Sequence, residues 1–278
     1  MFLLNKTENP NSWKDLRPIS FIPAILAILE KISLPLVREI TKPLISKFQF
    51  GFKEGSSCNL VKLRISYLAN QKGHNKILLI DLAKAFDSVR LDYLQSVINN
   101  SLQDPDQVSF LSKFITIYKN LEIDLNGYTL RPENGVPQGA TLSPIFFNII
   151  IDPIIRDLRN LFPNIDIGLY ADDIEVQSNN IQILTEALRI LQYKLIELNL
   201  HINFDKCVLI SKENSDKIVT PIGTDITAVT HSKYLGQYID SSGKPLLDLN
   251  QSNFGKLIHI LKENSGLTRY ARIKIFKI

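Results

Sequence analysis

Two adjacent carboxylates, Asp172 and Asp173, are the side chains in this sequence best suited to bind a cation. They follow an apolar run at 167–170 and precede another at 174–176, a pattern typical of two strands joined by a tight turn. Neighbouring acids without a compensating charge repel each other, so they do not stabilise a turn. A hard divalent cation prefers carboxylate oxygens and would reverse that repulsion. Because Asp-Asp pairs also occur in ordinary loops, a metal site requires a third ligand.

Asp81 is the candidate for that third ligand. The apolar residues 77–80 predict a buried strand that ends at Asp81, and a carboxylate at a strand end can face a cleft. Alone, Asp81 would be interpreted as a strand-end residue or a helix N-cap. Together with Asp172 and Asp173 it indicates a two-metal site, which in phosphoryl transfer stabilises both the attacking and the leaving oxygen.

A loop at 135–144 lies between these acids in the sequence. It contains two glycines and two prolines, which favour a rigid backbone that other groups can approach closely. Ser143 followed by Pro144 predicts an N-cap and the first position of a helix, and the apolar residues 145–151 predict that this helix is buried. Such a loop can lie under a flat ligand, or it can be plain architecture.

The elements that would position these residues mix helices and strands without strict alternation, which favours an α+β fold. An apolar helix is expected over 22–37, broken or kinked at Pro35. The remaining expectations are helices at 91–98 and 108–118, a hairpin at 121–130 turning at Asn126-Gly127, a long amphipathic helix from Asn180, strands at 207–210, 218–220 and 234–239, and a basic helical tail from Asn253. No GxGxxG or P-loop pattern occurs.

The charge is unevenly distributed along the 278 residues. The net charge of +4 divides into +6 over 1–72, −7 over 73–255 and +5 over 256–278. An acidic centre between basic flanks suits a metal site bordered by surfaces for a polyanion, although charge counts alone also fit ordinary scatter. The apolar stretch at 19–29 is too short to span a bilayer and no signal peptide is evident, so we expect an intracellular protein without a membrane partner. The two cysteines, which lack metal-ligand spacing, are expected to be free thiols.

Several motifs in one order resemble those of the reverse transcriptase family, in particular its LINE-type (non-LTR retrotransposon) branch. They are Asp81 with Phe86-Asp87, then Gly-Val-Pro-Gln-Gly-Ala-Thr-Leu-Ser-Pro at 135–144, then Tyr-Ala-Asp-Asp at 170–173. Residues 16–20 and 49–53 resemble fingers motifs, residues 203–206 resemble the motif after the catalytic hairpin, and residues 234–236 resemble the primer-grip strand. The resemblance therefore covers nearly the whole chain.

This resemblance implies a role for individual residues. Asp81, Asp172 and Asp173 would bind two Mg²⁺ ions, with Mn²⁺ as a possible substitute. Phe86 would lie under the sugar of the incoming nucleotide and exclude a ribose 2′-hydroxyl, although a phenylalanine there also reads as core. The other implied contacts are Gln138 and Gly139 to the nucleotide, Lys206 near the triphosphate, Arg17 and Lys6 to triphosphate oxygens, and Tyr170, Tyr234, Leu235 and Gly236 to the primer. Asp87 is expected to cap a turn or pair with another side chain rather than to bind metal. Without the resemblance, Lys206 would be interpreted as an ordinary exposed lysine.

The family also implies an architecture and partners. We expect a right-hand polymerase with an antiparallel palm sheet packed on helices: partial, N-terminally truncated fingers over 1–72, a palm over 73–240, and the start of a thumb over 241–278. The expected partners are an RNA template, a DNA primer, dNTPs, and other domains of the parent polyprotein such as an endonuclease, with action in the nucleus. The expected reaction is attack of a primer 3′-hydroxyl on a dNTP. A truncated, inactive mobile-element remnant that at most binds nucleic acid is the alternative. A carboxylate-metal phosphohydrolase would explain the acids but not Phe86 or Gln138.

Overall fold

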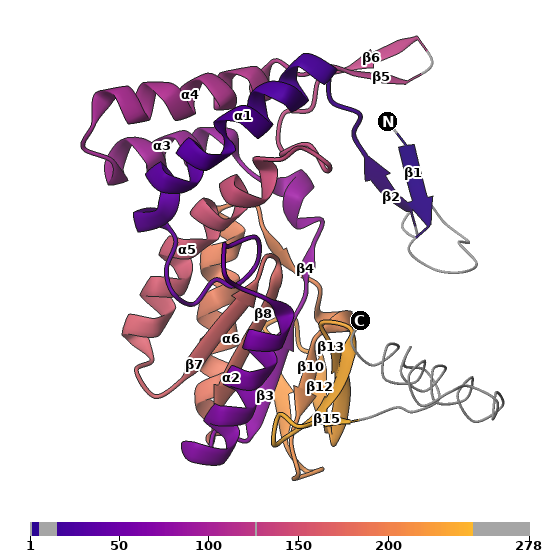
Figure 1. The fold of residues 1–278 in the computed structure, drawn as a ribbon. Coiled ribbons are helices and arrows are strands. Elements are labelled where there is room, and N and C mark those ends of the chain that lie inside the picture. Colours follow the sequence, from indigo (N-terminus) through magenta and orange to yellow (C-terminus); the bar gives the residue numbers. More distant parts are fainter. Residues whose placement is uncertain (1, 6–15, 126, 247–278) are drawn as a thin grey trace, which may run out of the picture.

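A six-stranded sheet forms the centre of the computed structural model, which describes residues 2–5, 16–125 and 127–246 (Figure 1). The strand order is β11-β12-β10-β3-β8-β7, so the first of these strands in the chain, β3, lies inside the sheet. Every pair is antiparallel except β10 with β12, which makes the sheet mixed rather than the purely antiparallel one expected. The bounds are β3 Lys76–Ile80, β7 Asp166–Tyr170, β8 Asp173–Ser178, β10 Val208–Ile210, β11 Lys217–Val219 and β12 Asp225–Val229.

Both faces of β3 are buried, because side chains alternate across the sheet and each face is covered. Leu78 and Ile80 belong to the main core, to which the helices α5 (Ser143–Leu161) and α6 (Ile181–Glu197) contribute. Ile77 and Leu79 belong to a smaller core on the other face, which includes α2 (Cys58–Gln71). The continuous apolar run at 77–80 thus reflects burial on both sides, as the sequence predicted.

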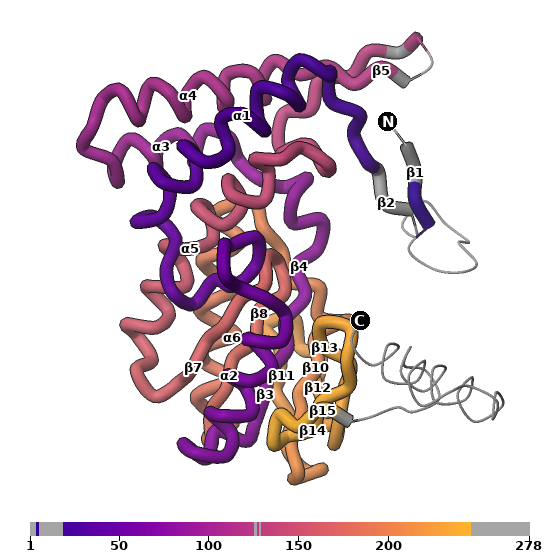
Figure 2. The backbone as a smooth tube through the Cα atoms, viewed as in Figure 1, coloured from indigo at the N-terminus to yellow at the C-terminus, as the bar shows by residue number. Residues whose placement is uncertain are grey.

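The helices α1 (Ala24–Thr41), α3 (Leu91–Ser101) and α4 (Pro105–Lys119) form a helical region beside the sheet (Figures 1 and 2). Glu30 of α1 is fully buried there and accepts hydrogen bonds from the Tyr118 hydroxyl at 2.6 Å and the Thr141 amide at 2.6 Å. One carboxylate therefore ties α1 to α4 and to the loop at 135–144. The helix α1 continues through Pro35 to Thr41, so of the break or kink expected at Pro35 the break does not occur; buried residues of its last turns pack into the core.

Short strand pairs and 3₁₀ turns complete the described chain. The hairpin predicted at 121–130 is present as β5 (Ile123–Leu125) and β6 (Tyr128–Leu130). The other pairings are β1 (Phe2–Asn5) with β2 (Leu16–Ile19), β4 (Leu82–Ala83) with β9 (His201–Ile202), and β13 (His231–Tyr234) with β14 (Gln237–Asp240), which also pairs with β15 (Pro245–Leu246). The 3₁₀ turns are η2 Lys42–Leu44, η3 Ala85–Ser88 and η4 Phe204–Lys206.

Two local predictions are wrong. The single strand expected at 234–239 is a hairpin, because Leu235 and Gly236 adopt φ of 45° and 79° and reverse the chain between β13 and β14. Ser143 is the first residue of α5 rather than its N-cap, which is Leu142, and the Ser143 hydroxyl donates to the Pro137 carbonyl at 2.8 Å.

The tail from Asn253 lies outside the described residues. Within the ranges the structure covers, none of the helices has the length and apolar character needed to cross a membrane.

Candidate active site

The three predicted metal-binding acids lie at one end of the central strands. Asp81 directly follows β3, whose last residue Ile80 is opposite Ile174 of β8. The next position along this antiparallel pair therefore brings Asp81 beside Asp173. Tyr170 pairs with Asp173 across the β7–β8 hairpin, which leaves Ala171 and Asp172 as its two-residue turn. Residues about ninety positions apart in the sequence thus share one edge of the sheet.

The electrostatics of this edge show that the acids interact. Burial, and to a smaller extent the negative charges of Asp172 and Asp81, together raise the pKa of Asp173 to about 6. Lys206 opposes this effect, and its Nζ lies 3.7 Å from Oδ2 of Asp81. The Lys206 side chain is 64 % exposed, so its charge is largely hydrated. Among the described residues whose charges act on Asp173, two acids raise its pKa and one cation, Lys206, lowers it.

These side chains match a divalent cation in their chemistry. Carboxylate oxygens are the donors that Mg²⁺ and Mn²⁺ prefer, and the repulsion at Asp173 is what a bound cation would relieve. In the described part of the chain, however, no three His, Cys, Asp or Glu side chains are gathered into a ready-made ligand set. The residues that would hold a cation are therefore present at one edge without forming a preassembled cage.

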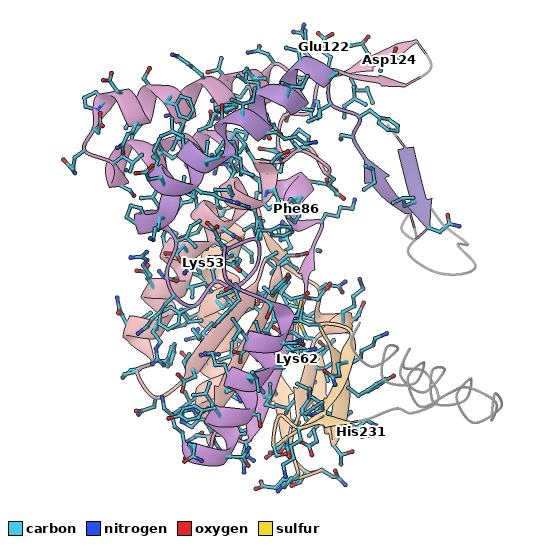
Figure 3. The ribbon with its side chains drawn as sticks, viewed as in Figure 1. Lys53, Lys62, Phe86, Glu122, Asp124 and His231 are labelled. Atoms are coloured by element: carbon cyan, nitrogen blue, oxygen red, sulfur yellow. The ribbon has the colours of Figure 1, made fainter. Side chains whose placement is uncertain are left out.

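The turn that carries Phe86 is docked against the loop at 135–144. The Phe86 carbonyl accepts from the Val136 amide at 2.9 Å, and the Gln138 side-chain amide donates to Oδ1 of Asp87 at 2.8 Å. The half-buried Phe86 ring stacks on Phe147 of α5, with centroids 5.2 Å apart and planes at 22°. Phe86 is labelled in Figure 3. The two segments predicted to meet the nucleotide thus form one surface, and Asp87 has a structural partner.

Gly139 brings the N-terminal part of the chain to this surface. Its φ is +113°, a conformation that favours glycine, and an added Cβ would lie 3.2 Å from the Ser20 carbonyl oxygen. The Ser20 amide donates to the Gln138 carbonyl at 2.8 Å, directly after β2. Arg17 lies in β2, where the structure describes its backbone, and Lys6 lies outside the described residues.

The residues predicted to contact a primer are differently exposed. Tyr170 is half-buried at the end of β7, where a hydrogen bond with the Cys58 side chain, together with burial, raises its pKa. Tyr234 is only 5 % exposed and packs in the smaller core, against which Tyr170 and Leu235 also pack. Tyr170 and Leu235 therefore border the same small core, and the Tyr234 ring lies inside it.

Comparison with known protein families matches residues 5–239 to the family described as "Reverse transcriptase (RNA-dependent DNA polymerase)". The match includes each segment that forms the edge described above. The chain belongs to the reverse transcriptase family. This confirms the family that the order of the sequence motifs predicted, a family of nucleotidyltransferases that synthesise DNA on RNA.

Curated relatives of this chain come from mobile elements and introns. The RNA-directed DNA polymerase from mobile element jockey of Drosophila funebris is 25 % identical over 308 aligned positions, covering 100 % of this chain. The Pol polyprotein from type-1 retrotransposable element R2 of Nasonia vitripennis is 28 % identical over 63 % of it, and the putative COX1/OXI3 intron 2 protein of Saccharomyces cerevisiae is 25 % identical over 58 %. The chain spans 18 % to 33 % of the length of these relatives.

Solved structures support the polymerase fold of the chain. Telomerase from Candida tropicalis, truncated from its C-terminal domain, matches with a TM-score of 0.56 and 14 % identity over 82 % of this chain and 49 % of that one. Telomerase from Candida albicans, in complex with the TWJ fragment of telomeric RNA, matches with a TM-score of 0.54 and 15 % identity over 86 % and 41 %. At this identity the likeness shows the fold alone, and it confirms the predicted α+β polymerase class.

Two buried side chains near the acids were not predicted from the sequence. Gln49 is 2 % exposed and hydrogen-bonds the backbone of Ala171, inside the hairpin that carries Asp172 and Asp173. Asn148 of α5 is 1 % exposed, and its Nδ2 donates to the Gly51 carbonyl at 2.9 Å. Gln49 lies in a segment that resembles a fingers motif, so its sequence position gives no indication of a contact with the β7–β8 hairpin.

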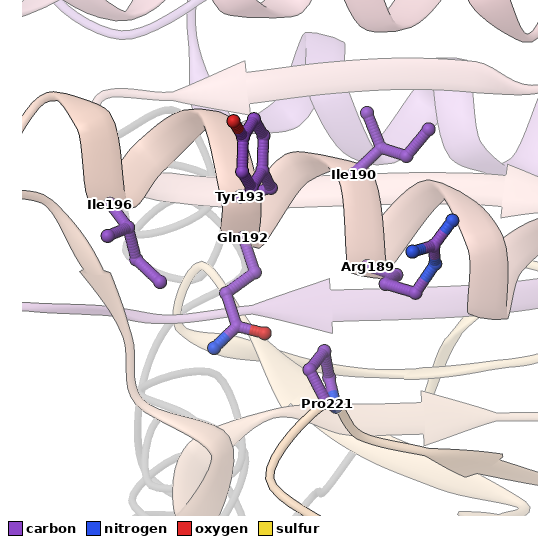
Figure 4. A pocket seen from close by; sticks show the side chains of 6 residues that line it. All are labelled: Arg189, Ile190, Gln192, Tyr193, Ile196 and Pro221. Atoms are coloured by element: carbon purple, nitrogen blue, oxygen red, sulfur yellow. The ribbon is translucent and has the colours of Figure 1, made fainter.

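The described part of the chain has two hollows that bear on the site. One lies between α6 and Pro221, away from the acids, and is lined mainly by Ile190, Tyr193 and Ile196 (Figure 4). The other adjoins Tyr170 and is lined by α1, by the segment after Gly51 and by the start of α5; it contains Leu34, Arg38, Phe52, Lys53, Glu54, Ser56, Thr141, Pro144 and Ile145. The second hollow places Arg38, Lys53 and Glu54 near Tyr170, the last residue of β7 before the turn with Asp172.

Proposed function

We propose that this chain is the polymerase core of a non-LTR retrotransposon reverse transcriptase, which adds dNTPs to a primer 3′-hydroxyl on an RNA template. The observation that carries the proposal is the meeting of Asp81 with the Asp172–Asp173 turn at one sheet edge, beside the surface formed by Phe86 and Gln138. The family match supports it. The fingers, palm and early thumb would follow the boundaries expected from the sequence.

Asp81, Asp172 and Asp173 would hold the divalent cations. When bound, two such ions stabilise the attacking and leaving oxygens of the phosphoryl transfer. The carboxylates contribute fixed negative charge at one edge, which orients cations and the phosphates that accompany them. Lys206 is near enough to Asp81 to share this edge, and its ammonium group would stabilise negative charge on the leaving pyrophosphate.

The other residues would position the reactants. Phe86 would support the sugar and exclude a 2′-hydroxyl through its ring, which Phe147 holds in place. Gln138 and Gly139 would contact the nucleotide beside it, and Tyr170 with the turn at Leu235 and Gly236 would contact the primer. Arg17 and Lys6 would reach the triphosphate. An RNA–DNA hybrid is A-like, so contacts to its shape and phosphates would dominate binding.

A primer-extension assay tests the proposal. Purified protein with a primed RNA template, dNTPs and Mg²⁺ should extend the primer, and Asp172→Asn should reduce extension to background. Asp225→Asn, which changes an exposed carboxylate on β12 that pairs with Lys217, is the control and should extend normally. Equal extension by Asp172→Asn and wild type would refute the assignment. Tight, salt-sensitive binding without incorporation would instead support an inactive remnant that only binds nucleic acid.

A further inference from the structure

The turn that carries the two aspartates contains an alanine in a conformation that alanine rarely adopts. Ala171 has φ +57°, in the left-handed region, and it is only 4 % exposed. A residue with a Cβ occupies this region at an energetic cost, so neighbouring contacts must hold it there. Ala171 directly precedes Asp172, and its conformation therefore sets the direction in which the chain presents both acids.

The side chain of Gln49 supplies such contacts from a distant part of the sequence. Its Oε1 accepts from the Ala171 amide at 3.0 Å, and its Nε2 donates to the Ala171 carbonyl at 3.4 Å. The same Oε1 accepts from the Gly51 amide at 2.8 Å. One buried side-chain amide thus bonds both the N–H and the C=O of Ala171. Without Gln49 these two buried backbone groups would lose those hydrogen bonds.

The segment that carries Gln49 is itself fixed against β7. The Leu169 amide donates to the Phe48 carbonyl at 2.9 Å, and the Phe50 amide donates to the Leu169 carbonyl at 2.8 Å. A Cβ on Gly51 would lie 2.2 Å from the Ala171 nitrogen, so the close approach requires glycine. Asn148 of α5 holds the Gly51 carbonyl from the other side. The segment therefore lies alongside β7, an edge strand of the sheet, and reaches the turn at Ala171.

We infer that Gln49 is a positioning residue, which holds Ala171 in the left-handed conformation and thereby fixes Asp172 and Asp173 for metal-dependent nucleotide addition. The inference rests on the proposed function for its catalytic consequence. Its structural part, the restraint of Ala171, concerns the free protein and can be measured without substrate. Catalysis is sensitive to displacements of about 1 Å, so a loosened turn should lower turnover more than it lowers substrate binding.

The test compares Gln49→Met with Gln177→Met. Methionine has a similar size and removes the amide in both cases. Gln177 is a matched control, because it is also fully buried and donates to backbone carbonyls, those of Ile65 and His74, at the other end of β8. We expect kcat for primer extension to fall roughly tenfold to a hundredfold in Gln49→Met, with the KM for dNTP nearly unchanged. Gln177→Met should retain the wild-type kcat per folded molecule.

Hydrogen exchange, read by NMR, measures the restraint directly. The Ala171 amide should exchange faster in Gln49→Met than in wild type, whereas the Ala228 amide, which donates to the Asp216 carbonyl at 3.0 Å, should be unchanged. If Gln49→Met does not fold, Gln49→Asn gives the same test, because its amide is one methylene too short to bond Ala171 as Gln49 does. Unchanged Ala171 exchange, or a kcat loss no larger than that of Gln177→Met, would overturn the inference. If wild type does not extend primers, the proposed function fails, and Ala171 exchange still decides whether Gln49 restrains the turn.

Discussion

At the scale of single residues, Phe86 is the side chain whose proposed role can be separated most clearly from its packing. Its ring has one face against Phe147 and is half-buried, so it is partly available to a ligand. A ring held by stacking resists displacement, because moving it would break an aromatic contact of about 1 kcal/mol. This rigidity is what a steric barrier against a 2′-hydroxyl requires.

Phe86→Val should therefore weaken the discrimination between dNTPs and rNTPs. Valine leaves space where the ring lay, and we expect rNTP incorporation relative to dNTP to rise by roughly tenfold or more, equivalent to about 1.4 kcal/mol of transition-state discrimination. The measurement is the ratio of kcat/KM for the two substrates in primer extension. Phe110→Val, which disrupts the Phe110–Phe114 pair on α4, is the control for a lost aromatic contact. Equal selectivity in Phe86→Val and wild type would remove Phe86 from the site.

The sequence predicted the chemical groups of the site better than the side chains that hold them. Acids at strand ends and a Gly- and Pro-containing loop have patterns that indicate function directly. Gln49 and Glu30 gave no such signal, because a buried polar residue is recognised only through its partners. Two of these partners, Ala171 for Gln49 and Thr141 for Glu30, lie more than a hundred positions away. Tyr234 was predicted to contact the primer, but nothing local in the sequence showed that the hairpin turns its ring into the core.

At the scale of elements, the end of the sheet opposite the acids depends on a buried ion pair. Lys76 begins β3, and its side chain is 8 % exposed. Its ammonium group pairs with Asp216, which precedes β11, and with Glu213 at 3.0 Å. The Ser211 hydroxyl also donates to Asp216, at 2.6 Å. Burial opposes ionisation of Asp216, but the hydrogen bonds from Lys76 and Ser211 prevail and lower its pKa below the usual value.

Asp216→Asn should consequently reduce stability in a pH-dependent way. A lowered folded-state pKa means that the ionised carboxylate stabilises the fold above the unfolded pKa of about 3.9 and that this contribution is lost as the pH falls through the folded value. We expect the variant to lose about 2 kcal/mol of unfolding free energy at pH 7, and the difference from wild type to shrink below about pH 4. Urea unfolding at several pH values measures it. A difference independent of pH would show that the charge of Asp216 is not responsible.

Local sequence patterns predicted whether a segment forms a helix or a strand, but they did not predict where such a segment is interrupted or continues. The apolar periodicity of α6 and the run in β3 each require a buried face, so their prediction needed no distant contact. The chain reversal at Leu235 and Gly236 divides a stretch that the sequence predicts as one strand. It was not predicted because leucine rarely adopts a positive φ, and the hydrogen-bonded pairing of β13 with β14 offsets the energetic cost of that conformation. The continuity of α1 through Pro35 depends likewise on the packing of its last turns.

At the scale of the whole molecule, the strand order is what assembles the site, and sequence spacing does not reveal it. Because β3 lies between β10 and β8, Asp81 adjoins the turn at Asp172, and the short η4 turn brings Lys206 to the same edge. The Asn203 amide, just before η4, donates to the Asp81 carbonyl at 2.9 Å. The same arrangement places the positively charged N-terminal part of the chain, with Arg38 and Lys53, around the hollow beside Tyr170.

If a nucleic-acid strand passes Tyr170, the binding of template–primer should depend on these two cations and on salt. Lys53 is labelled in Figure 3, and both Arg38 and Lys53 line the hollow. The slope of log K against log salt is negative, and each phosphate contact that is lost makes it less steep by about one unit. Arg38→Ala combined with Lys53→Ala should therefore make the slope less negative by roughly one to two units. Fluorescence anisotropy of a labelled RNA–DNA hybrid at several salt concentrations gives this slope.

The matched control for this prediction is Lys212→Ala, an exposed lysine that follows β10 at the end of the sheet remote from Asp81. It removes a positive charge and should leave the slope close to that of wild type, because a cation beyond about 10 Å from the strand is screened at 0.1 M salt. If the double variant and Lys212→Ala changed the slope by the same small amount per charge, binding would follow net charge alone. The path of the strand past Tyr170 would then be wrong, even if Asp81, Asp172 and Asp173 act as proposed.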